Sequence, residues 1–179
     1  SSSDPTCSEI TQLGFGLVVT DSVGNLVAYG AGVPPEFVTD SSMAETWAVW
    51  TVVEMCPWVP HITTDCLGIL NIAKGGTAAA VAASNQNARI WKPIAEATDG
   101  DITKVSGNLV WRPSHQNESA IGQRYKSDGK RISCLDHRAN KLVDKLATHR
   151  MAKSTVEKAS RKLIKEVKAA AGAALATLG

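Results

Sequence analysis

The chain has 179 residues, and 44% of them are hydrophobic, so its length suits one domain with a buried core and its composition argues against general disorder. A formal net charge of +2 does not by itself indicate a nucleic-acid partner, so any basic surface must come from local clustering. There is no membrane-length apolar run and no signal-peptide pattern, so we expect a soluble intracellular protein. The four cysteines are scattered without the spacing of a zinc site, so we expect them to be reduced; disulfides are the alternative.

The first regular structure expected is an antiparallel hairpin. Residues 1–13 are polar and turn-rich and predict a loop. Residues 14–20 and 26–32 are rich in β-branched and other apolar side chains, and residues 21–25 between them contain Gly and Asn. Two such runs joined by a short Gly/Asn turn favour a hairpin, which the prolines at 34 and 35 end.

A helix is expected next, beginning at Ser41 or Ser42 as N-cap and ending near Cys56, before Pro57. Glu45 lies near the capping-box position, and a capping role is its plainest interpretation. Residues 61–65 follow as a β-branched strand that ends in a carboxylate. Asp65 either caps the next helix or belongs to a site, because open α/β sheets bind ligands at the carboxyl ends of their strands.

The rest of the chain predicts further helices around one more strand. Helical segments are expected at 66–74, at 78–83, at 87–97 with Pro93 as a disturbance, and at 134–150. Residues 108–112 predict a strand, and residues 114–131 a long polar loop. A capping box at 154–157 predicts a last helix to about residue 176, whose basic side is either an ordinary solvated face or a phosphate-tracking surface.

Five segments, in this order, resemble the ribonuclease H domain of the cellular and retroelement type. They are Gly14-Phe15-Gly16, Ser42-Met43-Ala44-Glu45, Thr63-Thr64-Asp65, Trp111-Arg112-Pro113-Ser114-His115, and the N-x-x-x-D-x-L-A pattern from Asn140 to Ala147. The resemblance covers roughly residues 1–150 and implies an α/β ribonuclease H-like fold, with a mixed central sheet flanked by helices. Residues 151–179 would form a basic C-terminal helical extension.

The resemblance implies a catalytic set of Glu45, Asp65, His115 and Asp144. Glu45, Asp65 and Asp144 would hold Mg²⁺, with Mn²⁺ as the alternative ion, because Mg²⁺ prefers hard oxygen ligands. Two such ions about 4 Å apart activate a water and stabilise the leaving oxygen of a phosphodiester. His115, on the loop after the last strand, would move protons or assist product release, since histidine titrates near neutral pH.

The chain departs from the family pattern at its start. The family's first catalytic carboxylate ends a central first strand, whereas Asp4 is the nearest acid here and only three serines precede it. We therefore expect that the first strand and its Asp lie upstream, unless Asp4 replaces that Asp. The sheet would then fall into two pieces with unpaired edges, and the chain alone would be inactive or poorly folded.

The function expected from the resemblance is hydrolysis of the RNA strand of RNA–DNA hybrids, by a domain of a retroelement polyprotein that also carries a reverse transcriptase. Contacts to 2′-hydroxyls would distinguish RNA from DNA. One alternative is a non-catalytic module of the same fold that binds nucleic acid or a protein. Another is a DNA-directed nuclease, since an acidic core alone does not determine the substrate.

Overall fold

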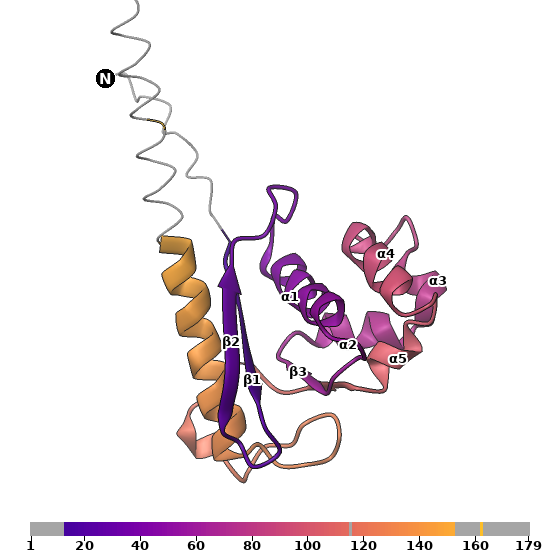
Figure 1. Ribbon diagram of the computed structural model, residues 1–179. Coiled ribbons are helices and arrows are strands. Elements are labelled where there is room, and N and C mark those ends of the chain that lie inside the picture. Colours follow the sequence, from indigo (N-terminus) through magenta and orange to yellow (C-terminus); the bar gives the residue numbers. More distant parts are fainter. Residues whose placement is uncertain (1–12, 115, 153–161, 163–179) are drawn as a thin grey trace, which may run out of the picture.

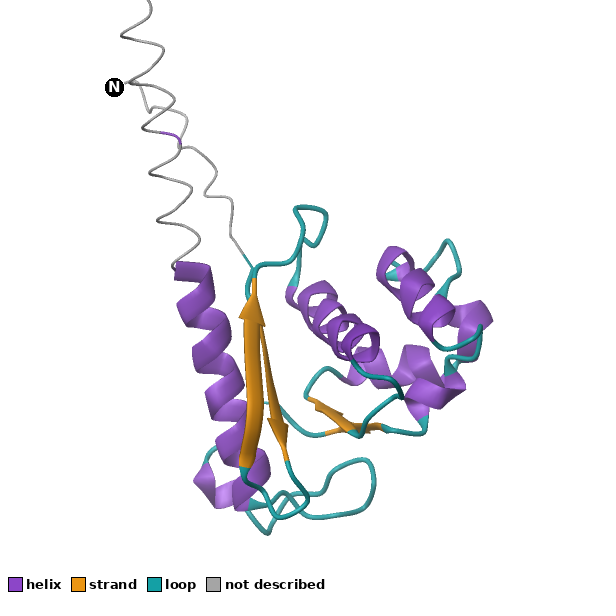
Figure 2. Cartoon of the chain, viewed as in Figure 1, coloured by secondary structure: helices purple, strands orange, loops and turns teal. Residues whose placement is uncertain are grey.

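The computed structural model describes residues 13–114, 116–152 and 162, which form a mixed α/β structure (Figure 2). The predicted α/β class is therefore confirmed. Three expectations lie outside the described residues: the roles of Asp4 and His115, and nearly all of the basic extension after residue 152.

The first two strands form the predicted antiparallel hairpin. β1 (Phe15–Thr20) pairs with β2 (Leu26–Gly32). The Asp21 carboxylate closes the turn by accepting hydrogen bonds from the main-chain N–H groups of Val23 and Asn25, at 3.0 and 2.8 Å. Such a side chain-to-backbone turn is a usual role of Asp, so the hairpin is specified by local sequence.

Most of the remaining described chain is helical. The helices are α1 (Ser41–Met55), α2 (Leu67–Lys74), α3 (Gly76–Ala80), α4 (Ala88–Ala97), α5 (Thr103–Ser106) and the short 3₁₀ helix η1 (Glu118–Ala120). Residues 134–152 are also helical, and this segment is called the 134–152 helix below. Helices α5 and η1 were not expected from the sequence, because each is a single short turn without a periodic pattern.

The strands do not join into the single central sheet that the resemblance implies. β3 (Ile62–Thr64) pairs in parallel with β4 (Leu109–Trp111), and among the described residues this pair is separate from the hairpin. Figure 1 shows α1 beside both β1 and β3. The described strands thus form two two-stranded sheets.

The buried core lies among the helices and β4. Six large side chains there have no solvent exposure: Ile69, Ile90, Trp91, Ile94, Ile102 and Val105. They come from α2, α4, α5 and the turn before α5, and they pack with the buried side of α1. We call this part of the molecule (α1–α5 with β3 and β4) the helical region.

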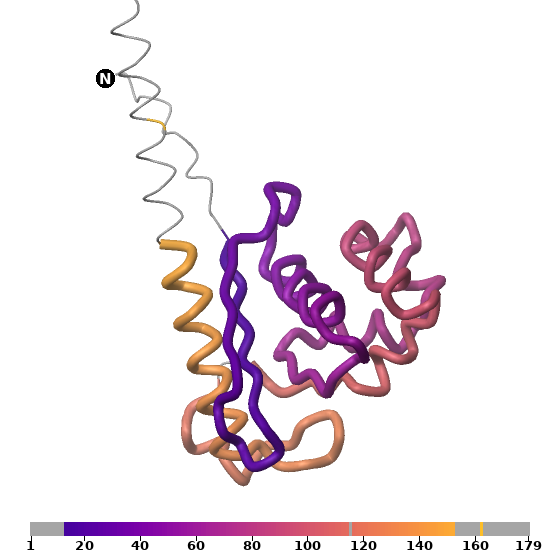
Figure 3. Tube along the Cα trace, viewed as in Figure 1, coloured from indigo at the N-terminus to yellow at the C-terminus, as the bar shows by residue number. Residues whose placement is uncertain are grey.

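The 134–152 helix packs closely against β1, although the two are far apart in the sequence (Figure 3). A Cβ atom on Gly16 would lie 2.7 Å from the main-chain oxygen of Val143, and one on Gly14 would clash with the backbone of Ala147. Glycine is therefore required at both positions for the helix to approach the strand. We call β1, β2 and this helix the hairpin region.

The structure corrects the predicted N-cap of α1 and confirms the predicted helix around Pro93. The N-cap of α1 is Asp40, not Ser41 or Ser42, because the Asp40 carboxylate accepts a 2.8 Å hydrogen bond from the Met43 N–H. Helix α4 also continues through Pro93, since buried side chains on both sides of the proline hold it in the core.

Two further features of the described part of the chain concern membrane crossing and disulfides. None of its helices combines the length and apolar character that crossing a membrane would need. The three cysteines in that part of the chain, Cys56, Cys66 and Cys134, are free thiols.

Candidate functional site

The first carboxylate of the site belongs to Glu45, on the side of α1 that faces β3. The Thr64 hydroxyl donates a 3.2 Å hydrogen bond to its Oε2 atom. The same Thr64 oxygen accepts from the Cys66 N–H at 3.2 Å, which fixes the threonine rotamer. Since Asp40 performs the capping, Glu45 is not needed for it and is instead directed to the end of β3.

The second carboxylate, Asp65, follows β3 directly. Its main-chain oxygen accepts a 3.1 Å hydrogen bond from the indole N–H of Trp111 at the end of β4. Helix α2 begins after Cys66, and no side-chain hydrogen bond caps it. The interpretation of Asp65 as a helix cap is therefore wrong, and its carboxyl group stands at the end of a parallel strand pair instead.

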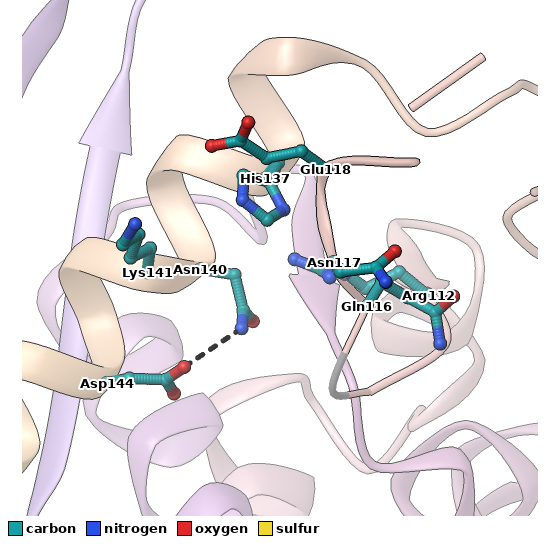
Figure 4. A pocket seen from close by; sticks show the side chains of 8 residues that line it. All are labelled: Arg112, Gln116, Asn117, Glu118, His137, Asn140, Lys141 and Asp144. Carbon is teal, nitrogen blue, oxygen red and sulfur yellow. Dashed lines mark hydrogen bonds between the residues drawn. The ribbon is translucent and has the colours of Figure 1, made fainter. Parts of the chain in front are cut away.

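The third carboxylate comes from the hairpin region. Asp144 lies on the 134–152 helix, one turn after Asn140, whose side-chain amide donates a 3.2 Å hydrogen bond to Asp144 Oδ2. Figure 4 shows this bond and the direction of the Asp144 side chain, away from its own helix. The two residues of the N-x-x-x-D pattern thus support each other across one helical turn.

The pKa of Glu45 is affected by both of the other carboxylates. Burial raises the pKa of Glu45, and so do the negative charge of Asp65, a hydrogen bond between these two carboxyl groups, and the more distant charge of Asp144. The Thr64 hydroxyl opposes them, and the net result is a pKa of about 7 for Glu45. Carboxyl groups crowded in a partly buried place resist ionising together.

The predicted constellation is thus brought together in part. Glu45 and Asp65 are in contact, and Asp144 is near enough to affect Glu45, although its helix packs on the other sheet. Nowhere in residues 13–114, 116–152 and 162 do three Asp, Glu, His or Cys side chains already stand as one metal-holding group. The donor set is nevertheless all oxygen, which is the kind of ligand that Mg²⁺ takes.

A pocket of about 340 Å³ adjoins Asp144, between the segment after β4 and the 134–152 helix (Figure 4). Its lining is mostly polar and basic: Arg112, Gln116, Asn117, Glu118, His137, Asn140, Lys141 and Asp144. Apart from Asp144, none of these residues was expected from the sequence to act in catalysis or metal binding. Helical spacing could have indicated four of them, because positions 137, 140, 141 and 144 share one face of a helix.

The chain matches no protein-family model, no curated protein and no solved structure.

Proposed function

We propose that this chain is a metal-dependent nuclease of the ribonuclease H type, which hydrolyses the RNA strand of an RNA–DNA hybrid. The observation that carries the proposal is the contact between Glu45 and Asp65, with the charge of Asp144 acting on Glu45 from a third element of the chain. Each stands at the place in the chain where the five-segment resemblance puts a metal ligand. The ribonuclease H-like fold is part of the same proposal.

The electrostatic repulsion between Glu45 and Asp65 supports a cation site. A pKa of about 7 means that Glu45 gives up its proton reluctantly at neutral pH. A divalent cation would remove this difficulty, because it replaces the proton between the oxygens and offsets the repulsion between Glu45 and Asp65. Asp144 would complete a second ion position. Bound ions would supply an activated water and charge stabilisation for phosphodiester hydrolysis.

The residues around the carboxylates would position the ligands. Thr64 holds Glu45 through its hydroxyl, and Asn140 holds Asp144 through its amide. Trp111 binds the main chain of Asp65 and so fixes the turn between β3 and α2. Such outer contacts orient ligating carboxylates and reduce the rearrangement that a bound ion requires.

A second candidate is a non-catalytic module of the same fold that binds nucleic acid or a protein. It is favoured by one observation, that the described side chains include no three acidic, His or Cys groups already in place around an ion. In this case the three carboxylates would be too far apart to support a metal pair, and the chain would bind a partner without cutting it.

The decisive experiment is cleavage of an end-labelled RNA–DNA hybrid in Mg²⁺, compared for the unaltered chain, Asp65→Asn and Asp99→Asn. Each is tested in two forms, as it stands and with an Asp-bearing first strand fused before residue 1. Asp99 is an exposed residue paired with Lys104, so its variant is a matched charge control. We expect Asp65→Asn to lower the rate by at least about 100-fold and Asp99→Asn to leave it unchanged. Duplex DNA and duplex RNA as parallel substrates separate a hybrid-specific enzyme from a DNA-directed one.

A folded chain that binds the hybrid but cuts it in neither form, in Mg²⁺ or in Mn²⁺, would refute the nuclease and support the binding module. Cleavage gained only in the fused form would support the nuclease and show that the added Asp is needed. Cleavage that survives Asp65→Asn would also contradict the proposal, because the activity would then come from other residues or from a contaminant. Thermal unfolding with and without Mg²⁺ provides an independent measure: the ion should stabilise the unaltered chain more than Asp65→Asn.

A further inference from the structure

The feature that the proposed function does not use is the buried guanidinium of Arg112, which follows β4. Arg112 is 2% exposed, and its Nη1 donates a 3.0 Å hydrogen bond to the main-chain oxygen of Asp136. Its Nε is buried without a hydrogen-bond partner. The Asp136 carboxylate is engaged elsewhere, by Lys126 at 3.1 Å and by Ser133 at 2.7 Å.

Arg112 is therefore a buried cation without a counter-charge: within the described ranges, no carboxylate forms an ion pair with it. Arginine keeps its proton in proteins, so it cannot escape by titrating. A buried charge is unfavourable unless it is paired. The place where a compensating anion can enter is the pocket that Arg112 lines.

The other side of this pocket is built for the same kind of ligand. His137 and Lys141 line the pocket from the 134–152 helix, and Gln116 and Asn117 line it from the segment after β4, where Glu118 also lies (Figure 4). The Gln116 amide already donates a 2.7 Å hydrogen bond to the main-chain oxygen of Ser114. Lys141, His137 and Asn117 carry further N–H donors, which suit an anion with several oxygens. Asp144 lines the same pocket, so the ligand would lie next to the carboxylates.

We propose that the pocket binds a backbone phosphate of a nucleic-acid strand, with Arg112 and Lys141 as its cationic contacts. The choice of a nucleic-acid strand, as opposed to a free phosphate, rests on the proposed function. A phosphate held here positions the neighbouring phosphodiester beside Asp144, because one strand passes both places. The pocket is then the positioning subsite of the proposed nuclease, and it carries no sequence information.

The first test is binding of a fluorescently labelled RNA–DNA hybrid to the full chain, followed by anisotropy without divalent ions. Lys141→Gln should weaken binding about 5- to 10-fold. It should also reduce the slope of log affinity against log salt concentration by about one, which corresponds to one released counterion. Lys145→Gln is the matched control: Lys145 is exposed on the same helix, one turn further, and does not line the pocket. It should bind within about twofold of the unaltered chain, as expected for an exposed charge away from the ligand. Equal losses from the two lysine variants would overturn the proposal.

Arg112→Met distinguishes an arginine that binds phosphate from one that only stabilises the fold. We expect hybrid binding to fall at least about 10-fold, while the melting temperature of the free chain stays the same or rises, since an unpaired buried charge has been removed. A variant that melts lower and binds the hybrid as well as the unaltered chain would show that Arg112 serves the fold, and this would overturn its assigned role.

The second test identifies the phosphate source by NMR of the histidine rings. The hybrid should shift the His137 ring signals and leave those of His61, which does not line the pocket, in place. Inorganic phosphate should shift His137 in the same direction at far higher concentration. If inorganic phosphate shifts His137 and the hybrid does not, the pocket is a free-phosphate site, and the strand assignment is wrong.

The outcomes also separate this proposal from the nuclease. A chain that binds the hybrid through Lys141 and Arg112 but never cuts it, even with the Asp-bearing strand fused before residue 1, would keep the phosphate subsite and refute the enzyme. A chain that cuts the hybrid in an Asp65-dependent way, with binding indifferent to both pocket variants, would refute the subsite alone.

Discussion

The helical region and the hairpin region are held together by different means. The helical region surrounds side chains with no solvent exposure, such as Trp91 and Ile94. In the hairpin region, apolar residues of the turn and β2 remain open to solvent: Val23 is 80% exposed and Tyr29 65%. The hairpin is attached by close backbone approach at Gly14 and Gly16 and by its contact with α1 (Figure 1).

This difference has a consequence for the site. Glu45 and Asp65 come from the helical region, whereas Asp144 comes from the hairpin region. The carboxylates therefore meet where a well-packed unit joins a thinly packed one. We expect the Glu45–Asp65 pair to persist whenever the helical region is folded, and the position of Asp144 to depend on how firmly the hairpin region is attached.

The largest effect is expected from Ile94→Ala, which removes a fully buried side chain from α4. The cavity should lower the free energy of unfolding by about 2–5 kcal/mol. Urea unfolding followed by tryptophan fluorescence measures it. A loss below about 1 kcal/mol would mean that the helical region is not the closely packed unit described here.

Gly16→Ala tests the attachment of the hairpin region. The new methyl group would lie 2.7 Å from the Val143 oxygen and force the helix away from β1, for an expected loss of about 1–3 kcal/mol. Gly68→Ala in α2 is the control, because its Cβ would meet only Cys66 Sγ at 3.7 Å. That variant should be neutral or up to about 1 kcal/mol more stable. Equal behaviour of the two variants would contradict the close approach.

Glu45→Gln probes the junction itself through its pH dependence. The folded pKa of about 7 lies above the ordinary glutamate value of 4.5, so the folded state binds the Glu45 proton more tightly than the unfolded state does. Stability should therefore fall as pH rises from about 4.5 to 7 and stay lower above pH 7. Glu45→Gln removes this fall and should be about 1–3 kcal/mol more stable than the unaltered chain at pH 8, with little difference at pH 4.

The measurement is the melting temperature against pH, with Glu54→Gln, at an exposed position on the same helix, as the matched control. Added Mg²⁺ at pH 8 should stabilise the unaltered chain and not Glu45→Gln if the carboxylates bind the ion. A Glu45→Gln chain that is less stable than the unaltered one at pH 8 would show that the carboxylate is not under strain.

The smallest effect is expected from Val27→Thr on β2. Val27 is 64% exposed, so exchanging a methyl group for a hydroxyl should change the free energy of unfolding by less than about 0.5 kcal/mol. A loss above about 1 kcal/mol, measured by the same urea titration, would show that β2 is covered in solution and that the hairpin region has a partner.

Local sequence was sufficient for the elements whose signals lie within a few residues. Alternating apolar residues and the turn around Asp21 predicted the hairpin, and the β-branched run before Asp65 predicted β3. The sequence also offered Glu45, Asp65 and Asp144 as candidate site residues, because each belongs to a short pattern that resembles the ribonuclease H family. These features depend on side-chain periodicity and turn chemistry, which neighbours along the chain determine.

Other features were decided only by tertiary structure, because they depend on residues distant in the sequence. Core packing keeps α4 helical through Pro93, and the strand pairing divides the described strands into two sheets. The raised pKa of Glu45 requires Asp65 and Asp144 beside it, and the unpaired charge of Arg112 requires burial against the 134–152 helix. Burial and electrostatic interaction are properties of the assembled fold, and no local pattern in the sequence encodes them.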